Sequence, residues 1–101
     1  MTLLGLQERF QAELERRLDD IACALAGARD PESLMRMFHS LAGIAGTYRF
    51  HRITEISRKC EDFCVDVMSC SRGLGVEDVA RLLCSVEAMR EARESPELSP
   101  R

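Results

Sequence analysis

A histidine followed by two glycines stands out in a segment that is otherwise typical of a helix, because the histidine side chain could do chemistry. Residues 39–50 read HSLAGIAGTYRF, so Gly43 and Gly46 follow His39 at about one and two helical turns. Glycine costs a helix interior about 1 kcal/mol relative to alanine, and its repeated use here needs a reason. An imidazole can act as a nucleophile near neutral pH, which makes His39 the first candidate for chemistry.

Helical periodicity predicts that His39 faces outward. The core stripe of its helix consists of Leu34, Phe38, Leu41, Ala45 and Tyr48. At about 100° per residue, His39 lies roughly 140° from the centre of this stripe. Its neighbours on the same side are Met35, Ala42, Gly43 and Gly46. Two explanations for the glycines stay open: they leave room for a macromolecule to reach His39, or they admit a neighbouring helix.

Four amphipathic segments must position this histidine. Apolar residues recur at spacings of three and four over residues 3–26, 31–48 and 52–68, and again from residue 76 onward. Asp30 and Pro31 form a strong helix start, and Gly27 closes the segment before it. Because no strand alternation appears and the loops are short, we predict an all-α, antiparallel up-and-down four-helix bundle over residues 1–93, with a flexible tail at 94–101.

Composition narrows the class of protein. A chain of 101 residues that is 46% hydrophobic suits one domain, and a net charge of -3 without a basic face argues against nucleic acid as a partner. No apolar run could span a membrane and no signal peptide is evident, so we expect a cytoplasmic location. We also expect a monomer. The odd number of cysteines argues for reduced core residues rather than disulfides. They are Cys23, Cys60, Cys64, Cys70 and Cys84.

The segment HSLAGIAGTYRF resembles the signature of the histidine-containing phosphotransfer (HPt) domain family. It is most similar to the version in the N-terminal domain of chemotaxis histidine kinases, commonly HSIKGGAGTFGF. The resemblance covers about residues 5–92 and implies that His39 carries a phosphoryl group, that Gly43 gives access to it, and that Glu61 accepts a hydrogen bond from the imidazole. Such a carboxylate would fix the ring tautomer and leave the other nitrogen nucleophilic.

The sequence departs from that signature at two positions. Ala42 stands where many members have a lysine that helps to hold the phosphoryl oxygens, and the nearby cations that could replace it are Arg36 and Arg58. Arg49 replaces a glycine that closes the helix, so the turn must use a residue for which left-handed geometry costs more. Several cationic side chains make residues 49–59 basic. This region is either a solvated surface without a role, or a surface whose charge steers an acidic receiver domain toward the protein.

The leading hypothesis is a phosphorelay carrier that passes a phosphoryl group between a kinase or receiver aspartate and another receiver aspartate. The surface around His39, including Met35, Arg36, Ala42 and Gly46, would bind that partner. No nucleotide-binding loop is present, so we expect neither kinase activity nor a cofactor, and magnesium would belong to the receiver. One alternative is a docking module that binds a receiver or kinase without transfer. Another is a metal site using Cys60, Cys64, Cys70 and His51, although core packing explains the first two better.

Overall fold

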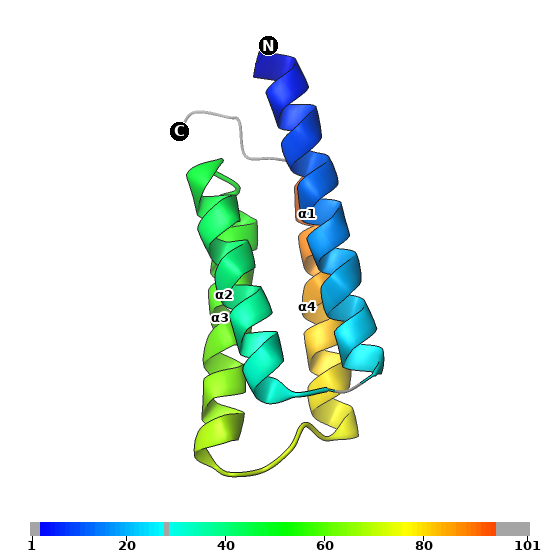
Figure 1. Ribbon diagram of the computed structural model, residues 1–101, viewed down its shortest axis with the longest axis vertical. Helices are drawn as coiled ribbons and strands as arrows, with labels where there is room; N and C mark the ends of the chain where they lie inside the picture. The colour runs from blue at the N-terminus through cyan, green and yellow to red at the C-terminus, as the bar shows by residue number, and fades with distance from the viewer. Residues whose placement is uncertain (1–2, 28, 95–101) are drawn as a thin grey trace.

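The computed structural model describes residues 3–27 and 29–94, and these form a bundle of four helices without a strand. The helices are α1 (Leu3–Ala26), α2 (Pro31–Thr47), α3 (His51–Ser69) and α4 (Val76–Glu94). Successive helices run in opposite directions and are joined by short loops (Figure 1). The predicted up-and-down four-helix bundle is therefore confirmed. Residues 95–101, which make up most of the expected tail, lie outside the described part of the chain.

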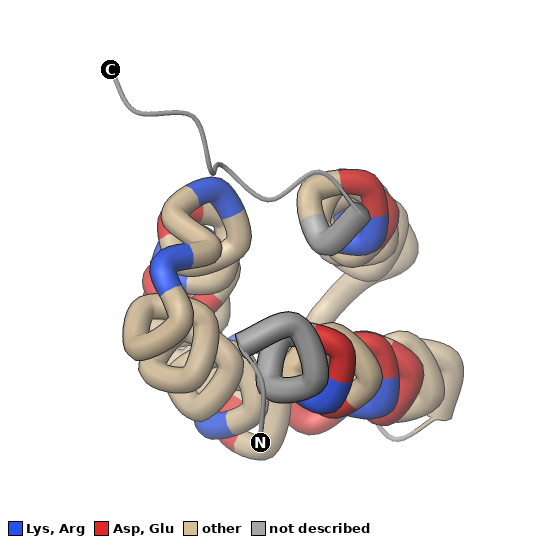
Figure 2. The backbone as a smooth tube through the Cα atoms, turned by 90° about the horizontal axis from the view of Figure 1, so that it is seen from above, with Lys and Arg blue, Asp and Glu red and all other residues tan. Residues whose placement is uncertain are grey.

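The helices form a ring in which each one packs against its neighbours in the chain order, and α4 returns to α1. Contact is most extensive between α2 and α3, which form a close antiparallel hairpin (Figure 1). Viewed along the bundle, the Lys, Arg, Asp and Glu residues lie mainly on the outer sides of the helices (Figure 2). The α2–α3 hairpin is thus the most tightly associated part of the fold.

The predicted core stripes are buried, with one exception at the end of α2. Leu34, Phe38, Leu41 and Ala45 are fully buried. Tyr48 is 41% exposed instead, because it follows the last residue of α2 and its ring stacks on Phe10 of α1 at a centroid distance of 3.7 Å. The interpretation of Tyr48 as a core residue was wrong: its ring covers the core from outside.

Side-chain hydrogen bonds also cross each of the four seams between neighbouring helices. Arg17 of α1 bonds to Ser40 of α2, and His39 of α2 bonds to Glu61 of α3. In the seam between α3 and α4, the buried Ser57 hydroxyl donates to the sulfur of Met89 at 3.2 Å. Arg90 of α4 closes the ring by donating to Asp19 of α1 at 2.7 Å.

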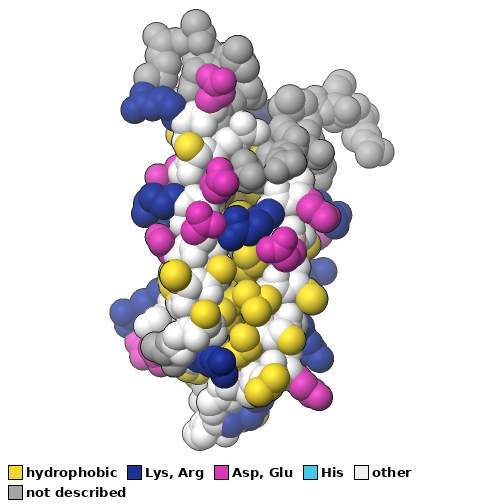
Figure 3. Space-filling model, turned by 90° about the vertical axis from the view of Figure 1, so that its right-hand side faces the viewer, with side chains coloured by type: hydrophobic (Ala, Val, Ile, Leu, Met, Phe, Trp, Pro, Cys, Tyr) yellow, Lys and Arg dark blue, Asp and Glu magenta, His cyan; other side chains and the backbone are white. Residues whose placement is uncertain are grey.

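Figure 3 shows the side formed by α1 and α4, where apolar side chains gather below a group of charged ones and no histidine is visible.

The cysteines divide between the core and the surface. Cys60 and Cys64 are buried in α3, as expected, whereas Cys23, Cys70 and Cys84 are exposed, and all five are free thiols. Burial raises the pKa of Cys64 to about 11, with smaller contributions from Cys60 and Glu61. A buried thiol with a raised pKa is a poor nucleophile at neutral pH, so Cys64 acts as an apolar packing residue.

Helix α2 begins and ends much as its sequence predicts. Asp30 is the N-cap, and its carboxylate accepts hydrogen bonds from both the backbone N–H and the hydroxyl of Ser33. At the other end Arg49 adopts a left-handed conformation with φ of 66°. An L-residue pays a steric cost for this conformation that glycine avoids. The expected strain at Arg49 is therefore present in the turn between α2 and α3.

Replacing Arg49 with glycine is expected to stabilise the protein. Glycine adopts the left-handed conformation without the steric cost that Arg49 pays, although it loses more chain entropy on folding. The net effect should be a rise of about 0.5–1 kcal/mol in the free energy of unfolding. Urea denaturation measures the change. The matched control is Lys59→Gly, at an exposed helical position of α3, which should lower stability by about 1 kcal/mol. A destabilised Arg49→Gly protein would contradict the argument.

Candidate functional site

His39 lies on the outer face of α2, where the periodicity placed it. Its side chain is 74% exposed although the residue before it, Phe38, is fully buried. The contrast follows from helical geometry, because consecutive residues differ by about 100° around the axis. A buried anchor therefore fixes the backbone at the point from which the imidazole projects.

Glu61 of α3 holds this imidazole from one side. The distance between His39 Nδ1 and Glu61 Oε2 is 2.9 Å, and the Glu61 side chain is only 22% exposed. An ionised carboxylate can only accept, so the proton of a neutral ring lies on Nδ1 and the lone pair lies on Nε2. The geometry thus presents Nε2 as the free nucleophilic nitrogen of an exposed ring.

An open depression lies beside the histidine, between α2 and α3. Its volume is about 330 Å³, and its walls are formed by His39, Ala42, Gly43, Arg58, Glu61 and Asp62. Arg58 thereby brings a cation to the same hollow as the imidazole. Arg36 does not line it: this side chain is 73% exposed and donates to Glu32 on its own helix at 2.6 Å. Of the two cations considered from the sequence, Arg58 is the better placed to meet an anion at His39.

The two glycines have different surroundings, and only Gly43 fits one of the explanations offered for them. A Cβ atom added at Gly43 would meet nothing within 4 Å, so this glycine leaves open surface one turn beyond His39. A Cβ atom at Gly46 would lie 3.7 Å from the Thr54 hydroxyl of α3, which is ordinary contact. Gly43 therefore keeps the approach to the histidine free. Gly46 lies beside α3, but the packing of the two helices there would also admit a Cβ atom.

The remaining residues predicted for the exposed surface are more buried than expected. Ala42 is 5% exposed, and Met35 is partly buried against the core. Ala42 lies beside α3, where the close packing of the hairpin covers it. The exposed surface around His39 is consequently narrower than the sequence indicated, and it includes Gly43 and Gly46.

The metal-site alternative finds no geometric support in the described residues. Within residues 3–27 and 29–94, no group of three or more His, Cys, Asp or Glu side chains could hold a metal ion. Cys60 and Cys64 are buried while Cys70 is exposed, so the proposed ligands do not form one site. In the same ranges no helix has the length and apolarity needed to cross a membrane.

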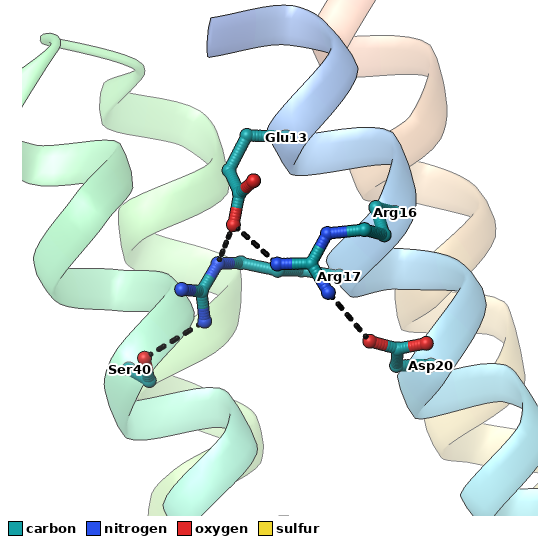
Figure 4. A network of polar contacts seen from close by, with 5 residues as sticks. All are labelled: Glu13, Arg16, Arg17, Asp20 and Ser40. Carbon is teal, nitrogen blue, oxygen red and sulfur yellow. Dashed lines mark hydrogen bonds and ion pairs between the residues drawn. The ribbon is translucent and has the colours of Figure 1, made fainter.

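One contact beside His39 was missed in the sequence. Arg17 of α1 donates from Nη1 to the hydroxyl of Ser40 at 3.0 Å, and from Nε to Glu13 at 2.8 Å (Figure 4). Glu13 also accepts from Arg16, which reaches Asp20 in turn. The spacing of Glu13 and Arg17 is a readable i,i+4 signal, but their link to Ser40 depends on how α1 is aligned with α2.

Comparison with known proteins agrees with this geometry. The Hpt domain family matches residues 5–95, nearly the whole chain. No curated protein and no solved structure matches the chain. A four-helix bundle with an exposed histidine on its second helix, together with a family match of this extent, establishes that the chain belongs to the Hpt domain family.

Proposed function

We propose that this protein carries a phosphoryl group on His39 in a two-component phosphorelay. The group would come from a receiver aspartate or a histidine kinase and pass to another receiver aspartate. The observation that carries the proposal is the bond between Nδ1 of the exposed His39 ring and the Glu61 carboxylate. Membership of the Hpt domain family supports it.

The proposed transfer uses the free nitrogen of the imidazole. Nε2 attacks the phosphorus in line with the leaving oxygen, the Nε2–P bond forms, and the P–O bond to the donor aspartate breaks. The donor leaves as a carboxylate, and the proton on Nδ1 stays between the ring and Glu61. Because the ring gains positive charge as it is phosphorylated, the carboxylate stabilises both the transition state and the product. The reverse sequence returns the group to a second aspartate.

Cations around the ring would balance the charge of the bound phosphoryl group. Arg58 lines the depression beside His39 and offers several N–H donors to phosphoryl oxygens. Arg36 would have to leave Glu32 to contribute. Magnesium would be supplied by the receiver, whose carboxylates bind it during the transfer. The protein needs no nucleotide site of its own in this role.

A receiver domain would approach over Gly43, where the surface is open. Close approach matters because donor and acceptor oxygens must lie in line with Nε2, and a side chain at this position would stand between the two proteins. The partly buried Met35 and Ala42 would form the edge of this surface toward α3, and Gly46 would extend it toward the end of α2.

A non-transferring docking module is the second candidate. The observation that favours it is Ala42. This residue is buried and uncharged, and it stands where the signature that the segment resembles has a lysine. Such a module would bind a receiver over the same surface without accepting the phosphoryl group. The two candidates therefore differ in chemistry at His39, not in the surface used.

Phosphorylation by a small donor distinguishes the two candidates without a partner protein. The protein is incubated with phosphoramidate and its intact mass is measured at neutral and alkaline pH. A carrier should gain one phosphoryl group, held by an acid-labile P–N bond. A protein that gains none under conditions that phosphorylate an active Hpt domain would contradict the carrier proposal and favour the docking module.

Replacing Glu61 with glutamine is expected to slow phosphorylation of His39 about five- to tenfold, because the amide oxygen can still accept from Nδ1 but lacks the negative charge that stabilises the ring as it becomes positive. The initial rate with phosphoramidate measures this. Asp62→Asn is the matched control, since Asp62 is the next residue and lines the same depression without a bond to His39. Equal rates for the two variants would show that Glu61 has no special role.

A further inference from the structure

The seam between α1 and α2 is hollow on both sides of the contact between Arg17 and Ser40. Toward the end of α2, an open hollow of about 290 Å³ is lined by Arg9, Phe10, Glu13, Ile44 and Tyr48. Toward its start, a smaller hollow of about 60 Å³ is lined by Arg17, Asp20, Ile21 and Met37. Ser40 lies between the α2 residues of these two groups. The hydrogen bond therefore crosses the seam where apolar packing is interrupted.

The Arg17 side chain is well suited to bridge this seam rigidly. It is 30% exposed, and its guanidinium is held at two points, by Glu13 on its own helix and by Ser40 on α2 (Figure 4). Hydrogen bonds from Arg16 and Arg17 lower the pKa of Glu13, but a glutamate is ionised at neutral pH even without them, so the carboxylate that anchors Arg17 does not depend on Arg16 for its charge. The planar guanidinium is pre-organised, so it loses little side-chain freedom for each hydrogen bond that it forms across the seam.

The hydrogen bond from Arg17 ends on Ser40, the residue that directly follows His39. On the other flank of α2, Glu61 holds the imidazole from α3 at 2.9 Å. The turn of α2 that carries the histidine is thus held from both neighbouring helices, by the ring on one side and by Ser40 on the other. Phe38 fixes this turn from the core, and the Arg17 link adds a hold from α1 at Ser40. A misplacement of about 1 Å can cost roughly a hundredfold in rate, so even a partial shift would matter.

We propose that Arg17 is a positioning residue for phosphotransfer at His39, acting through the hydroxyl of Ser40. The inference rests on the proposed carrier function and adds α1 to the elements that set its geometry. Arg17 does not touch the reacting nitrogen. It holds the backbone turn from which His39 projects, so that the ring stays aligned with Glu61.

The test compares four variants with the wild type: Arg17→Gln, Ser40→Ala, the double variant and Arg16→Gln. Arg16 is the matched control, because it bonds to the same Glu13 carboxylate but makes no bond to α2. The initial rate of phosphorylation by phosphoramidate is measured by intact mass at a temperature where every variant is fully folded. Arg17→Gln and Ser40→Ala should each be about three- to tenfold slower, and the double variant no slower than the slower single one. Arg16→Gln should keep the wild-type rate.

A second readout separates positioning from stability. The 15N signals of the His39 ring report the bond from Nδ1 to Glu61, and they should shift in Arg17→Gln and Ser40→Ala but not in Arg16→Gln. Wild-type rates and ring signals in the first two variants would overturn the proposal, even if their melting temperatures fell. The same changes in Arg16→Gln would overturn it too. If the wild type accepts no phosphoryl group, the carrier function fails, and unchanged ring signals would then separately refute positioning by Arg17.

Discussion

Replacing His39 with glutamine is expected to abolish phosphorylation by phosphoramidate completely. Glutamine keeps a polar side chain of similar length but has no nucleophilic nitrogen, so no P–N bond can form. Because His39 is 74% exposed, its loss should leave the bundle intact, and the variant should unfold at nearly the wild-type denaturant concentration. Intact mass and urea denaturation together check both parts of this prediction.

The matched control for this variant is His51→Gln. His51 is the second of two histidines in the chain and lies exposed at the first residue of α3. It should accept no phosphoryl group, so its replacement should leave the extent of modification unchanged. A His39→Gln protein that still gains an acid-labile phosphoryl group, or a His51→Gln protein that gains none, would move the reactive residue away from His39.

We expect Phe38→Ala to lower the free energy of unfolding more than any of the other substitutions proposed for this protein. Phe38 is fully buried in the core next to the candidate site, and removal of a buried aromatic ring typically costs about 3–5 kcal/mol through lost burial and the cavity left behind. This is a large part of the roughly 5–15 kcal/mol that holds a domain folded. Guanidinium denaturation followed by circular dichroism measures the change in the free energy of unfolding.

The control for the Phe38 variant is an apolar residue at the surface. Val65 of α3 is 41% exposed, so Val65→Ala should change stability by about 0.5 kcal/mol or less. If Phe38→Ala cost no more than this control, the ring would not be part of the cooperative core. The burial of Phe38 also explains how His39 is placed, because the Phe38 ring anchors the same turn of α2 in the core.

Periodicity and the family resemblance together predicted most of the fold and the geometry at the centre of the candidate site. Spacings of three and four located all four helices, and the helical wheel placed His39 outward because the direction of a helical side chain follows from its position alone. The Glu61 contact came from the resemblance, since periodicity shows only that Glu61 lies on the flank of its helix. The close agreement in α2 follows from its strong start at Asp30 and Pro31.

The features that were missed depend on how helices are aligned with one another. Tyr48 was placed in the core because the stripe was extended one residue beyond the helix end. Ala42 was expected at the surface, but the α2–α3 hairpin packs closely enough to bury it. Arg17 and Ser40 are 23 residues apart on different helices, and no local pattern in either helix specifies that they meet. Such contacts depend on packing between elements, which a sequence pattern within one element does not encode.

The location of the His39–Glu61 contact within a single hairpin has a consequence for how the protein folds. The two residues are 22 positions apart, and only one tight turn separates their helices. Closing so short a loop costs little chain entropy, so the contact can form early, with α1 and α4 docking afterwards. The His39–Glu61 pair is thus encoded in one contiguous stretch of chain. The flanking helices contribute to this pair by supporting that stretch after it has formed.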